Sequence, residues 1–344
     1  MHVLIIKTSS LGDLIHTFPA LTDAGKMLPG IRFDWVVEEN YAEVPSWHPL
    51  VDQVIPVAIR RWRKNPLKSL FSQEWKKFRR QIREKKYAMV VDAQGLIKSA
   101  VLTRMARGLR VGLDKKSLTE SLARFAYQKT ITVDLKGHAV TRMREIFARA
   151  LNYTIPNPDV VNYGISEEIK KSFSVKEISS NYLVFLHGTT WVTKKWPDEY
   201  WEELAKIAAK AGFKVFLPWG NKEEQERAKK IAKHGGAIEV LPRMNLTDIA
   251  GIIANAKGAI AVDTGLGHLS AALDVPTISL YGPTDPKWIG TEGQKAVHLL
   301  AKFECVLCGN EVCRYKKATK VKPACFANLT PGFVWEKLWG LIKC

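Results

Sequence analysis

A single aspartate, Asp13, stands where the first apolar run of the chain gives way to a helical pattern. The run VLII ends at Ile6, and the stretch KTSSLGDLIHTFPAL begins at Lys7. A short carboxylate at such a strand-to-helix turn can cap the helix. It can also act as a general base toward the hydroxyl group of a substrate. Both interpretations are open at this point.

A second group of polar side chains follows the apolar runs of the C-terminal half. The sequence AVDTGLGH places an acid, two glycines and a histidine between a strand pattern and a helix pattern. Glycines let a ligand approach the backbone, and the N–H groups at a helix start favour phosphate. An ordinary capped turn is the alternative for this loop alone. The donor-side candidates on these loops are Thr189, Thr190, Lys194, Glu224, Met244, Asp263, Thr264, Gly265 and His268.

Two common nucleotide-binding signatures are absent from the sequence. No GxGxxG follows the first apolar run, and no GxxxxGK[ST] occurs in the chain. We therefore expect a nucleotide diphosphate that is bound by hydroxyl groups, lysines and a helix start, without a P-loop lysine.

The elements that position these residues alternate between short apolar runs and helical patterns. In the first half we expect strands at 2–7, 33–39, 53–59 and 87–94, and helices at 72–85, from about 98, and at 138–151. In the second half we expect strands at 181–188, 213–220, 237–242, 258–263 and 276–282, and helices at 198–211, 222–233, 246–255 and 267–273. Such alternation is typical of parallel α/β sheets.

The alternation is interrupted once, which predicts a domain boundary. Residues 152–168 contain Asn, Pro and Gly with little periodicity, so they are the expected linker. We predict two Rossmann-like, doubly wound α/β domains at 1–164 and 165–330, and a last helix within 331–344 that packs back on the first domain. Ligands bind at the carboxyl ends of parallel strands, so a cleft between two such edges is the expected site.

The chain is strongly basic, with a formal net charge of +18. Residues 1–164 contribute +12 of this, and the segment 60–86 alone holds 12 basic and 2 acidic residues. A basic surface indicates a polyanionic partner: nucleic acid, an anionic membrane or a phosphorylated substrate. A solvated helix face is the alternative for part of this charge.

The apolar runs of the chain are short. None approaches the roughly 18–20 apolar residues of a membrane span, and the start MHVLIIKTSS lacks the features of a signal peptide. We therefore expect a cytoplasmic protein.

All five cysteines lie after residue 300. Four of them have the spacing C-x2-C-x4-C-x11-C, which resembles a zinc site. Free or disulfide-linked thiols are the alternative for these four. They are Cys305, Cys308, Cys313 and Cys325.

Seven stretches in collinear order resemble the ADP-heptose:lipopolysaccharide heptosyltransferases, in particular the type I enzymes (heptosyltransferase I). They are KTSSLGDLIHTFPAL, IRRWRK, DAQGLIKSA, HAV, FLHGTTWVTKKWP, LPWGNKEE and AVDTGLGHLSAALDVPTISLYGPTDP. The similarity extends from residue 1 to about residue 290. DTGLGHLSAAL with YGPTDP marks the wider family, whereas KTSSLGD with IRRWRK indicates type I.

The resemblance implies a GT-B fold and an inverting glycosyl transfer that uses no metal and no other cofactor. It implies ADP-heptose as the donor substrate, bound by the second domain, and Kdo-bearing lipid A as the acceptor. It implies that Asp13 is the catalytic base. It also implies a peripheral location on the cytoplasmic face of the bacterial inner membrane, whose anionic surface would meet the basic first domain.

Acceptor-binding residues are expected in the first domain, where arginine forks suit phosphates and carboxylates. For the basic cluster at 60–64 a solvated surface is the alternative, and for His138 a structural role is equally open. The candidates are Lys7, Ser10, Gly12, Arg60, Arg61, Arg63, Lys64, Gln94, Lys98 and His138.

One departure from the family pattern concerns an acceptor-side cation. Type I relatives carry Arg-Glu-Pro where this chain has the residues TES at 119–121. Another cation would have to replace that arginine, and the candidates are Lys115, Lys116 and Arg124.

Three other functions compete with a type I transferase. The chain could be a type II enzyme or another sugar transferase of the family, which KTSSLGD and IRRWRK disfavour. It could be a nucleic-acid-binding protein, although no RNA- or DNA-binding module signature is present and we therefore expect no nucleic-acid partner. It could also be a nucleotide-sugar sensor without activity, which an intact Asp13 disfavours.

Overall fold

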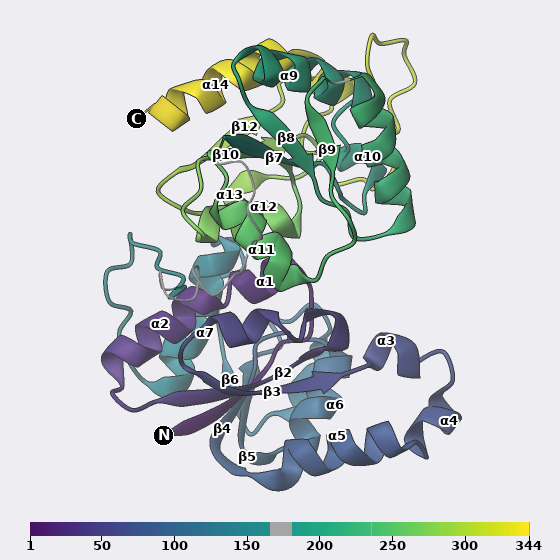
Figure 1. Cartoon of the computed structure of the whole chain (residues 1–344). Helices are drawn as coiled ribbons and strands as arrows, with labels where there is room; N and C mark the ends of the chain where they lie inside the picture. Colours follow the sequence, from purple (N-terminus) through teal and green to yellow (C-terminus); the bar gives the residue numbers. More distant parts are fainter. Residues whose placement is uncertain (166–180, 235, 344) are drawn as a thin grey trace. The chain divides into compact units, whose positions relative to one another are not determined.

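The computed structural model describes residues 1–165, 181–234 and 236–343 (Figure 1). The chain separates into two compact units, Met1–Ile165 and Ser166–Cys344. The boundary lies within one residue of the predicted division between 164 and 165. The expected linker at 152–168 falls partly outside the described residues. Within those residues, no helix is both long and apolar enough to span a bilayer.

Unit 1 is built on a parallel six-stranded sheet with the strand order β3-β2-β1-β4-β5-β6. Its strands are β1 (His2–Ile6), β2 (Arg32–Glu38), β3 (Val51–Val57), β4 (Lys86–Asp92), β5 (Arg107–Leu113) and β6 (Lys129–Ile131). Its helices are α1 (Leu11–Ile15), α2 (Phe18–Met27), α3 (Ile59–Trp62), α4 (Pro66–Leu70), α5 (Gln73–Glu84), α6 (Ile97–Met105) and α7 (Ala139–Leu151). The order reverses direction between β1 and β4, which makes that position the switch point of the sheet.

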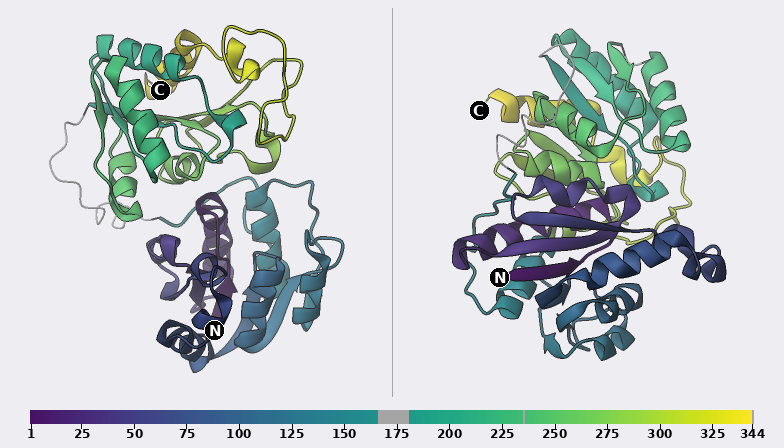
Figure 2. Two further views of the ribbon diagram at one scale, coloured as in Figure 1. Left: turned by 90° about the vertical axis from the view of Figure 1, so that its right-hand side faces the viewer. Right: turned by 60° about the horizontal axis from the view of Figure 1, so that its bottom comes forward.

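Helices cover both faces of this sheet (Figure 2), so β1 and β2 are buried on both sides. Leu4 and Ile6 of β1 pack with Phe78 and Ile82 of α5. On the opposite face, Phe33 and Trp35 of β2 contact Phe147 of α7 and Phe18 of α2 respectively. The alternation of side chains along each strand thus supplies two apolar layers.

Unit 2 repeats this architecture with the strand order β12-β11-β10-β7-β8-β9. Its strands are β7 (Tyr182–Leu186), β8 (Lys214–Leu217), β9 (Ile238–Val240), β10 (Gly258–Val262), β11 (Thr277–Tyr281) and β12 (Ala296–Leu300). Its helices are α9 (Asp198–Lys210), α10 (Lys222–His234), α11 (Leu246–Ala254), α12 (Gly265–Ala272), α13 (Pro286–Ile289) and α14 (Pro331–Lys343). The switch point lies between β7 and β10. The predicted class, two doubly wound α/β domains, is therefore confirmed.

The last helix, α14, belongs to unit 2. Val334 and Leu338 are fully buried there, in one core with Trp201 and Leu204 of α9. A Cβ atom on Gly258, at the start of β10, would lie 3.0 Å from Leu338, so this glycine lets the helix approach the sheet closely. The prediction that the last helix packs back on the first domain is therefore wrong. The apolar side chains of α14 are buried in the core of unit 2, the unit that directly precedes this helix in the chain.

Candidate active site

Asp13 lies at the switch point of the unit 1 sheet. The loop that leaves β1 carries Lys7 through Ser10, and α1 begins at Leu11. The neighbouring strand β4 ends at Asp92 and is followed by Gln94. The Oε1 atom of Gln94 accepts the backbone N–H groups of Thr8 (3.0 Å) and Ser9 (3.2 Å), so the two strand ends are joined. These hydrogen bonds connect the loops after β1 and β4 at the edge of the sheet where we predicted a ligand.

The Asp13 carboxylate makes contacts on two sides. Its Oδ2 atom accepts the backbone N–H of Ser10 at 2.7 Å and the Ser10 hydroxyl at 2.8 Å, as in a capping box. Its Oδ1 atom lies 3.8 Å from the Nζ atom of Lys7, which donates to the Ala93 carbonyl at 3.0 Å. The Asp13 side chain remains 46% exposed. Asp13 therefore caps α1 and still presents its carboxylate to solvent, so a capping role and a catalytic role are compatible.

A cavity of about 280 Å³ opens beside Asp13 within unit 1. Its polar lining could bind the hydroxyl and carboxylate groups of a sugar acid. The polar and charged residues that line it are Lys7, Asp13, His16, Gln94, Ser117, Thr119 and Arg142.

Arg142 is the cation of this cavity that the sequence did not reveal. It lines the cavity with Thr119, and the Asp13 carboxylate acts on it electrostatically. Burial lowers the pKa of the Arg142 guanidinium, and the charge of Asp13 partly opposes that shift. Lys115, Lys116 and Arg124 do not line the cavity. The sequence signal that could have identified Arg142 is its spacing, because it follows His138 by one helical turn in HAVTR.

The other unit 1 candidates occupy different positions around this edge. His138 caps α7, because its Nδ1 atom accepts the Val140 N–H at 3.2 Å, and its ring lies 5.9 Å from that of His16. Gly12 is buried in α1, whereas Ser10 is exposed. Lys98 lies half-buried in the first turn of α6 and does not line the cavity. The acceptor-binding roles of these residues stay predictions.

The cations of the basic cluster after β3 differ in how strongly neighbouring side chains hold them. Arg61 is held by two carboxylates, with distances of 3.0 Å to Glu39 and 2.8 Å to Glu74. The backbone N–H of Arg60 donates to Glu38 at 3.0 Å, and its guanidinium lies over the Tyr41 ring. We therefore expect Arg61 to hold the loop in place. The acceptor-binding prediction then depends on Arg60, Arg63 and Lys64.

In unit 2, the loops that follow β7, β10 and β11 meet at Asp263. The Asp263 carboxylate contacts the Nζ atom of Lys194 at 2.7 Å and accepts the Thr284 hydroxyl at 2.7 Å. Its backbone carbonyl accepts the Thr189 hydroxyl at 3.2 Å. Only 14% of the Lys194 side chain and 6% of the Asp263 side chain are exposed, so this pair is a desolvated hub at the switch point.

The remaining donor-side candidates surround this hub on the same edge. Glu224 accepts the Gly220 N–H at 2.7 Å, and a Cβ atom on Gly188 would lie within 3.1 Å of the Glu224 carboxylate. Thr264 is the N-cap of α12, whose first turn holds Gly265 and His268. Thr190 is exposed on the β7 loop, and Met244 lies half-buried after β9. The chain thus brings nine predicted residues to one edge of unit 2.

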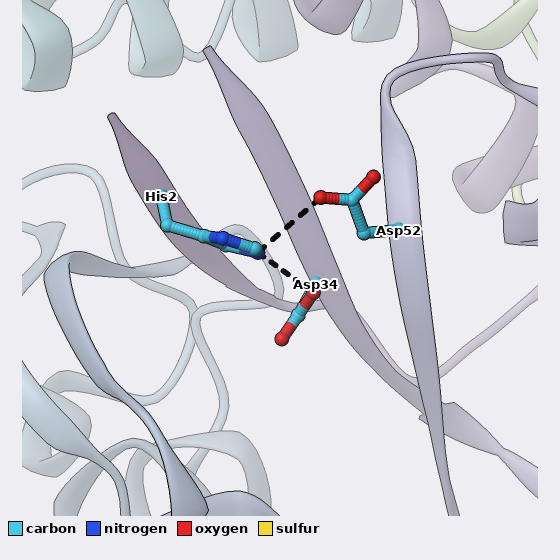
Figure 3. A group of neighbouring side chains, drawn as sticks. All are labelled: His2, Asp34 and Asp52. Carbon is cyan, nitrogen blue, oxygen red and sulfur yellow. Dashed lines mark hydrogen bonds and ion pairs between the residues drawn. The ribbon is translucent and has the colours of Figure 1, made fainter.

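Potential metal ligands gather in one place within the described residues. His2, Asp34 and Asp52 offer ligand atoms within 4.8 Å of one another (Figure 3). Lys85 already pairs with Asp34 at 2.9 Å, and Arg32 lowers the pKa of Asp52 through its hydrogen bond. These residues lie at or near the amino ends of their strands, away from Asp13. We interpret the group as an ion-pair network that joins the strand starts.

The four tail cysteines are free thiols within unit 2. In the described part of the chain, no three of their Sγ atoms come within 4.8 Å of one another.

Comparison with known proteins identifies the family. The profile of glycosyltransferase family 9 (heptosyltransferase) matches residues 75–319. Lipopolysaccharide heptosyltransferase 1 of Pseudomonas aeruginosa is 48% identical over 99% of this chain and 98% of its own length. The enzyme of the same name from Escherichia coli K12 is 48% identical over 86% of this chain and 92% of its own length.

Solved structures agree with the sequence matches. The structure of E. coli heptosyltransferase WaaC with ADP has a TM-score of 0.86 and 44% identity, over 99% of this chain and 100% of that chain. E. coli ADP-heptose lps heptosyltransferase II, at 22% identity, has a TM-score of 0.75 and shows the same fold. The predicted GT-B fold and the resemblance are confirmed, and the chain belongs to glycosyltransferase family 9, the heptosyltransferases.

Proposed function

We propose that the chain transfers L-glycero-D-manno-heptose from ADP-heptose to a Kdo residue of Kdo-lipid A, with inversion at the anomeric carbon. The main support is the long match to relatives named lipopolysaccharide heptosyltransferase 1, at 47–48% identity over 86–99% of the chain. Relatives named heptosyltransferase 2 match at 27–32% identity over less than half of it. Type I activity is therefore favoured over type II.

In this proposal Asp13 is the general base. The acceptor hydroxyl oxygen attacks the anomeric carbon as the bond from that carbon to the diphosphate oxygen breaks, and Asp13 takes the hydroxyl proton. Lys7, at 3.8 Å, supports the ionised carboxylate. Arg142 would bind the carboxylate and phosphate groups of the acceptor, together with the remaining cations of the cluster, Arg60, Arg63 and Lys64.

Unit 2 would hold the donor and stabilise the leaving ADP. A lysine ammonium has three N–H donors, so Lys194 can keep Asp263 and still donate to a diphosphate. The N–H groups at the start of α12 add a favourable dipole. WaaC has been solved with ADP-2-deoxy-2-fluoro heptose, and that structure is 43% identical to this chain, which supports an ADP-sugar as the ligand.

We also propose a peripheral location on an anionic membrane surface, reached from the cytoplasmic side. The aromatic residues of the basic segment 60–86 are Trp62, Phe71, Trp75 and Phe78. Trp62 and Trp75 pack against each other and against Phe78, with 5.3 Å between the two indole rings, so they support the fold. The exposed apolar side chains are instead Leu67 (75%), Leu70 (48%) and Phe71 (79%), beside the basic face of α5. These three would meet the lipid.

The decisive experiment uses ADP-heptose and Kdo-lipid A as substrates. We expect mass spectrometry to find one added heptose on Kdo-lipid A. A product that forms only on acceptors already carrying one heptose would assign type II activity instead.

A binding assay separates the enzyme from a nucleic-acid-binding protein. ADP at about 100 times its dissociation constant should raise the free energy of unfolding by about 2.7 kcal/mol. Greater stabilisation by UDP or GDP would contradict the adenine assignment. Tight, salt-sensitive retention of random RNA without an ADP response would favour nucleic acid.

A further inference from the structure

The segment between β12 and Pro323 is a long connection that the apolar core does not hold. Residues 301–323 contain no helix or strand, and none of the residues 302–322 is buried. Loops longer than about 12–15 residues without secondary structure are uncommon in compact domains. A connection of this length needs another source of stability.

Backbone contacts bring the cysteines of this segment to one place in unit 2. The N–H of Leu307, between Cys305 and Cys308, donates to the Gly282 carbonyl at 2.8 Å, and the N–H of Gly309 donates to the Pro283 carbonyl at 2.9 Å. A Cβ atom on the same Gly282 would lie 2.9 Å from the Sγ atom of Cys325. The CxxC turn and Cys325 therefore both contact Gly282.

The third cysteine lies close to this group. Cys313 lines a cavity of about 740 Å³ together with Pro323 and Ala324, the two residues before Cys325. Leu307 has φ +61° and Gly309 has φ +63°, so the chain turns sharply at the CxxC segment. The CxxC turn, the segment around Cys313 and the segment around Cys325 therefore bring four thiols to one region of unit 2.

The charge around these thiols favours thiolates. Residues 302–325 contain six basic and two acidic residues. Four thiolates around a divalent ion carry a net charge of −2, which this basic segment would stabilise.

We propose that Cys305, Cys308, Cys313 and Cys325 bind one zinc ion as four thiolates, with release of the four thiol protons. Their Sγ atoms are not gathered within 4.8 Å, so binding must draw the segment inward. Cys308 and Cys313 are exposed on a stretch without buried residues, so they can move toward Cys325. Sulfur ligands in tetrahedral sites are typical of zinc.

The same segment contacts both sides of the Asp263 hub. The hydroxyl of Thr193, beside Lys194, donates to the Asn310 carbonyl at 2.5 Å. Pro283, which accepts from Gly309, precedes the Thr284 that donates to Asp263. Zinc would therefore hold the donor edge in place without touching substrate. This last link rests on the proposed donor role of the hub, whereas the zinc site itself does not.

Metal content tests the site directly. Full-length protein, purified under reducing conditions without a chelator or a polyhistidine tag, should contain about one zinc ion per chain. Cys308→Ser and Cys313→Ser change exposed side chains, so they should fold and lose the zinc. Cys344→Ser removes the fifth cysteine, which is not part of the C-x2-C-x4-C-x11-C pattern and falls outside the described residues, and should retain the zinc. Cobalt reconstitution should give the thiolate charge-transfer bands of a tetrahedral site.

The contrary results are distinct from one another. A wild-type protein that has no stoichiometric metal and takes up no cobalt overturns the site, as does full zinc content in Cys308→Ser. A loss of two protons per disulfide in the unreduced intact mass would assign disulfides instead. Release of zinc by a mercurial should reduce the thermal stabilisation by ADP. An unchanged ADP response would overturn the link to the donor edge, and a missing response in the zinc-loaded protein would overturn the donor assignment.

Discussion

At the residue scale, the Asp13 carboxylate has both the contacts of a helix cap and the exposure that the proposed base requires, two roles that sequence reasoning presented as alternatives. Its Oδ2 atom completes the capping box with Ser10, while the side chain stays 46% exposed beside Lys7. The capping contact fixes the orientation of the carboxylate. A residue that is both a cap and a base is therefore oriented before the acceptor arrives.

Asp13→Asn separates the two roles. The Asn carboxamide oxygen can still accept the Ser10 N–H, so we expect an unchanged melting temperature and an unchanged response to ADP. Loss of the base should lower the single-turnover rate with saturating ADP-heptose by about 10²–10⁴-fold. A rate within about threefold of wild type would show that Asp13 only caps α1 and that another group is the base.

Arg142→Gln tests the cation that sequence reasoning missed. Because a hydrogen bond to a charged group contributes about 1.5–3 kcal/mol, kcat/KM for the acceptor should fall by about 10- to 100-fold. Stabilisation by ADP should not change, since Arg142 lies in unit 1. The matched control is Arg124→Gln, because Arg124 does not line the cavity beside Asp13. Equal losses in the two variants would remove Arg142 from the acceptor site.

At the element scale, α4 is the proposed membrane contact. Leu67→Ser with Phe71→Ser should weaken pelleting with anionic liposomes, because it removes two apolar side chains that have no core to fill. The fold and the turnover of a water-soluble acceptor fragment should not change.

The control for this pair is Trp288→Ser, which removes an exposed aromatic side chain of unit 2. It should bind liposomes as the wild type does. High salt should weaken wild-type binding, because the basic residues around α4 add an electrostatic attraction. Equal binding of the wild type to neutral and anionic vesicles would contradict the proposal.

The elements differ in how far the sequence predicted them. Central strands such as β1 and β10 are continuous apolar runs, and their predicted positions were accurate to one or two residues. Sequence reasoning missed β5, whose sequence RGLRVGL mixes two arginines and two glycines, and β6, which has three residues. These strands form because they pair with β4 and with each other, and a local pattern does not reveal such pairing.

The residues of the candidate site also divide into those that the sequence predicted and those that it did not. Asp263 directly follows an apolar run and Asp13 lies in the first helix after another, so the rule that ligands bind at the carboxyl ends of strands predicted their positions. Arg142 lies on α7, and its approach to Asp13 depends on how that helix packs across the strand ends. Arg61 looked like an acceptor ligand because Glu39 and Glu74 are distant in sequence. The position of Arg142 beside Asp13 and the ion pairs of Arg61 both depend on the tertiary fold, and a single sequence does not reveal them.

At the scale of the whole molecule, each unit contains a buried histidine that is neutral when folded. Burial lowers the pKa of His48 in unit 1 and of His187 in unit 2 to about 3. The Nδ1 atom of His48 accepts the Leu50 N–H at 3.2 Å, and its Nε2 atom contacts the Thr22 hydroxyl. A proton on Nδ1 would oppose the Leu50 N–H, so protonation and the folded state exclude each other.

Stability should therefore fall as the pH drops below about 6.5. Between that value and about 3 the unfolded chain binds more protons than the folded chain, so each histidine removes up to about 1.4 kcal/mol per pH unit. His48→Asn keeps an acceptor for the Leu50 N–H and cannot be protonated there. Its urea midpoint should fall less than that of the wild type between neutral and mildly acidic pH. Parallel pH profiles would show that His48 does not control this loss.

The two units share one strand order, which places corresponding loops at the same edge of each sheet. Counted from its own first strand, unit 2 has the order of unit 1, since β9-β8-β7-β10-β11-β12 corresponds to β3-β2-β1-β4-β5-β6. The fourth strand leads to a buried aspartate in each case, Asp92 and Asp263. The segment after the first strand carries the acid Asp13, in the first turn of α1, in unit 1 and the cation Lys194 in unit 2. The two units therefore place their switch points, and the side chains proposed to act on acceptor and donor, at corresponding positions of one topology.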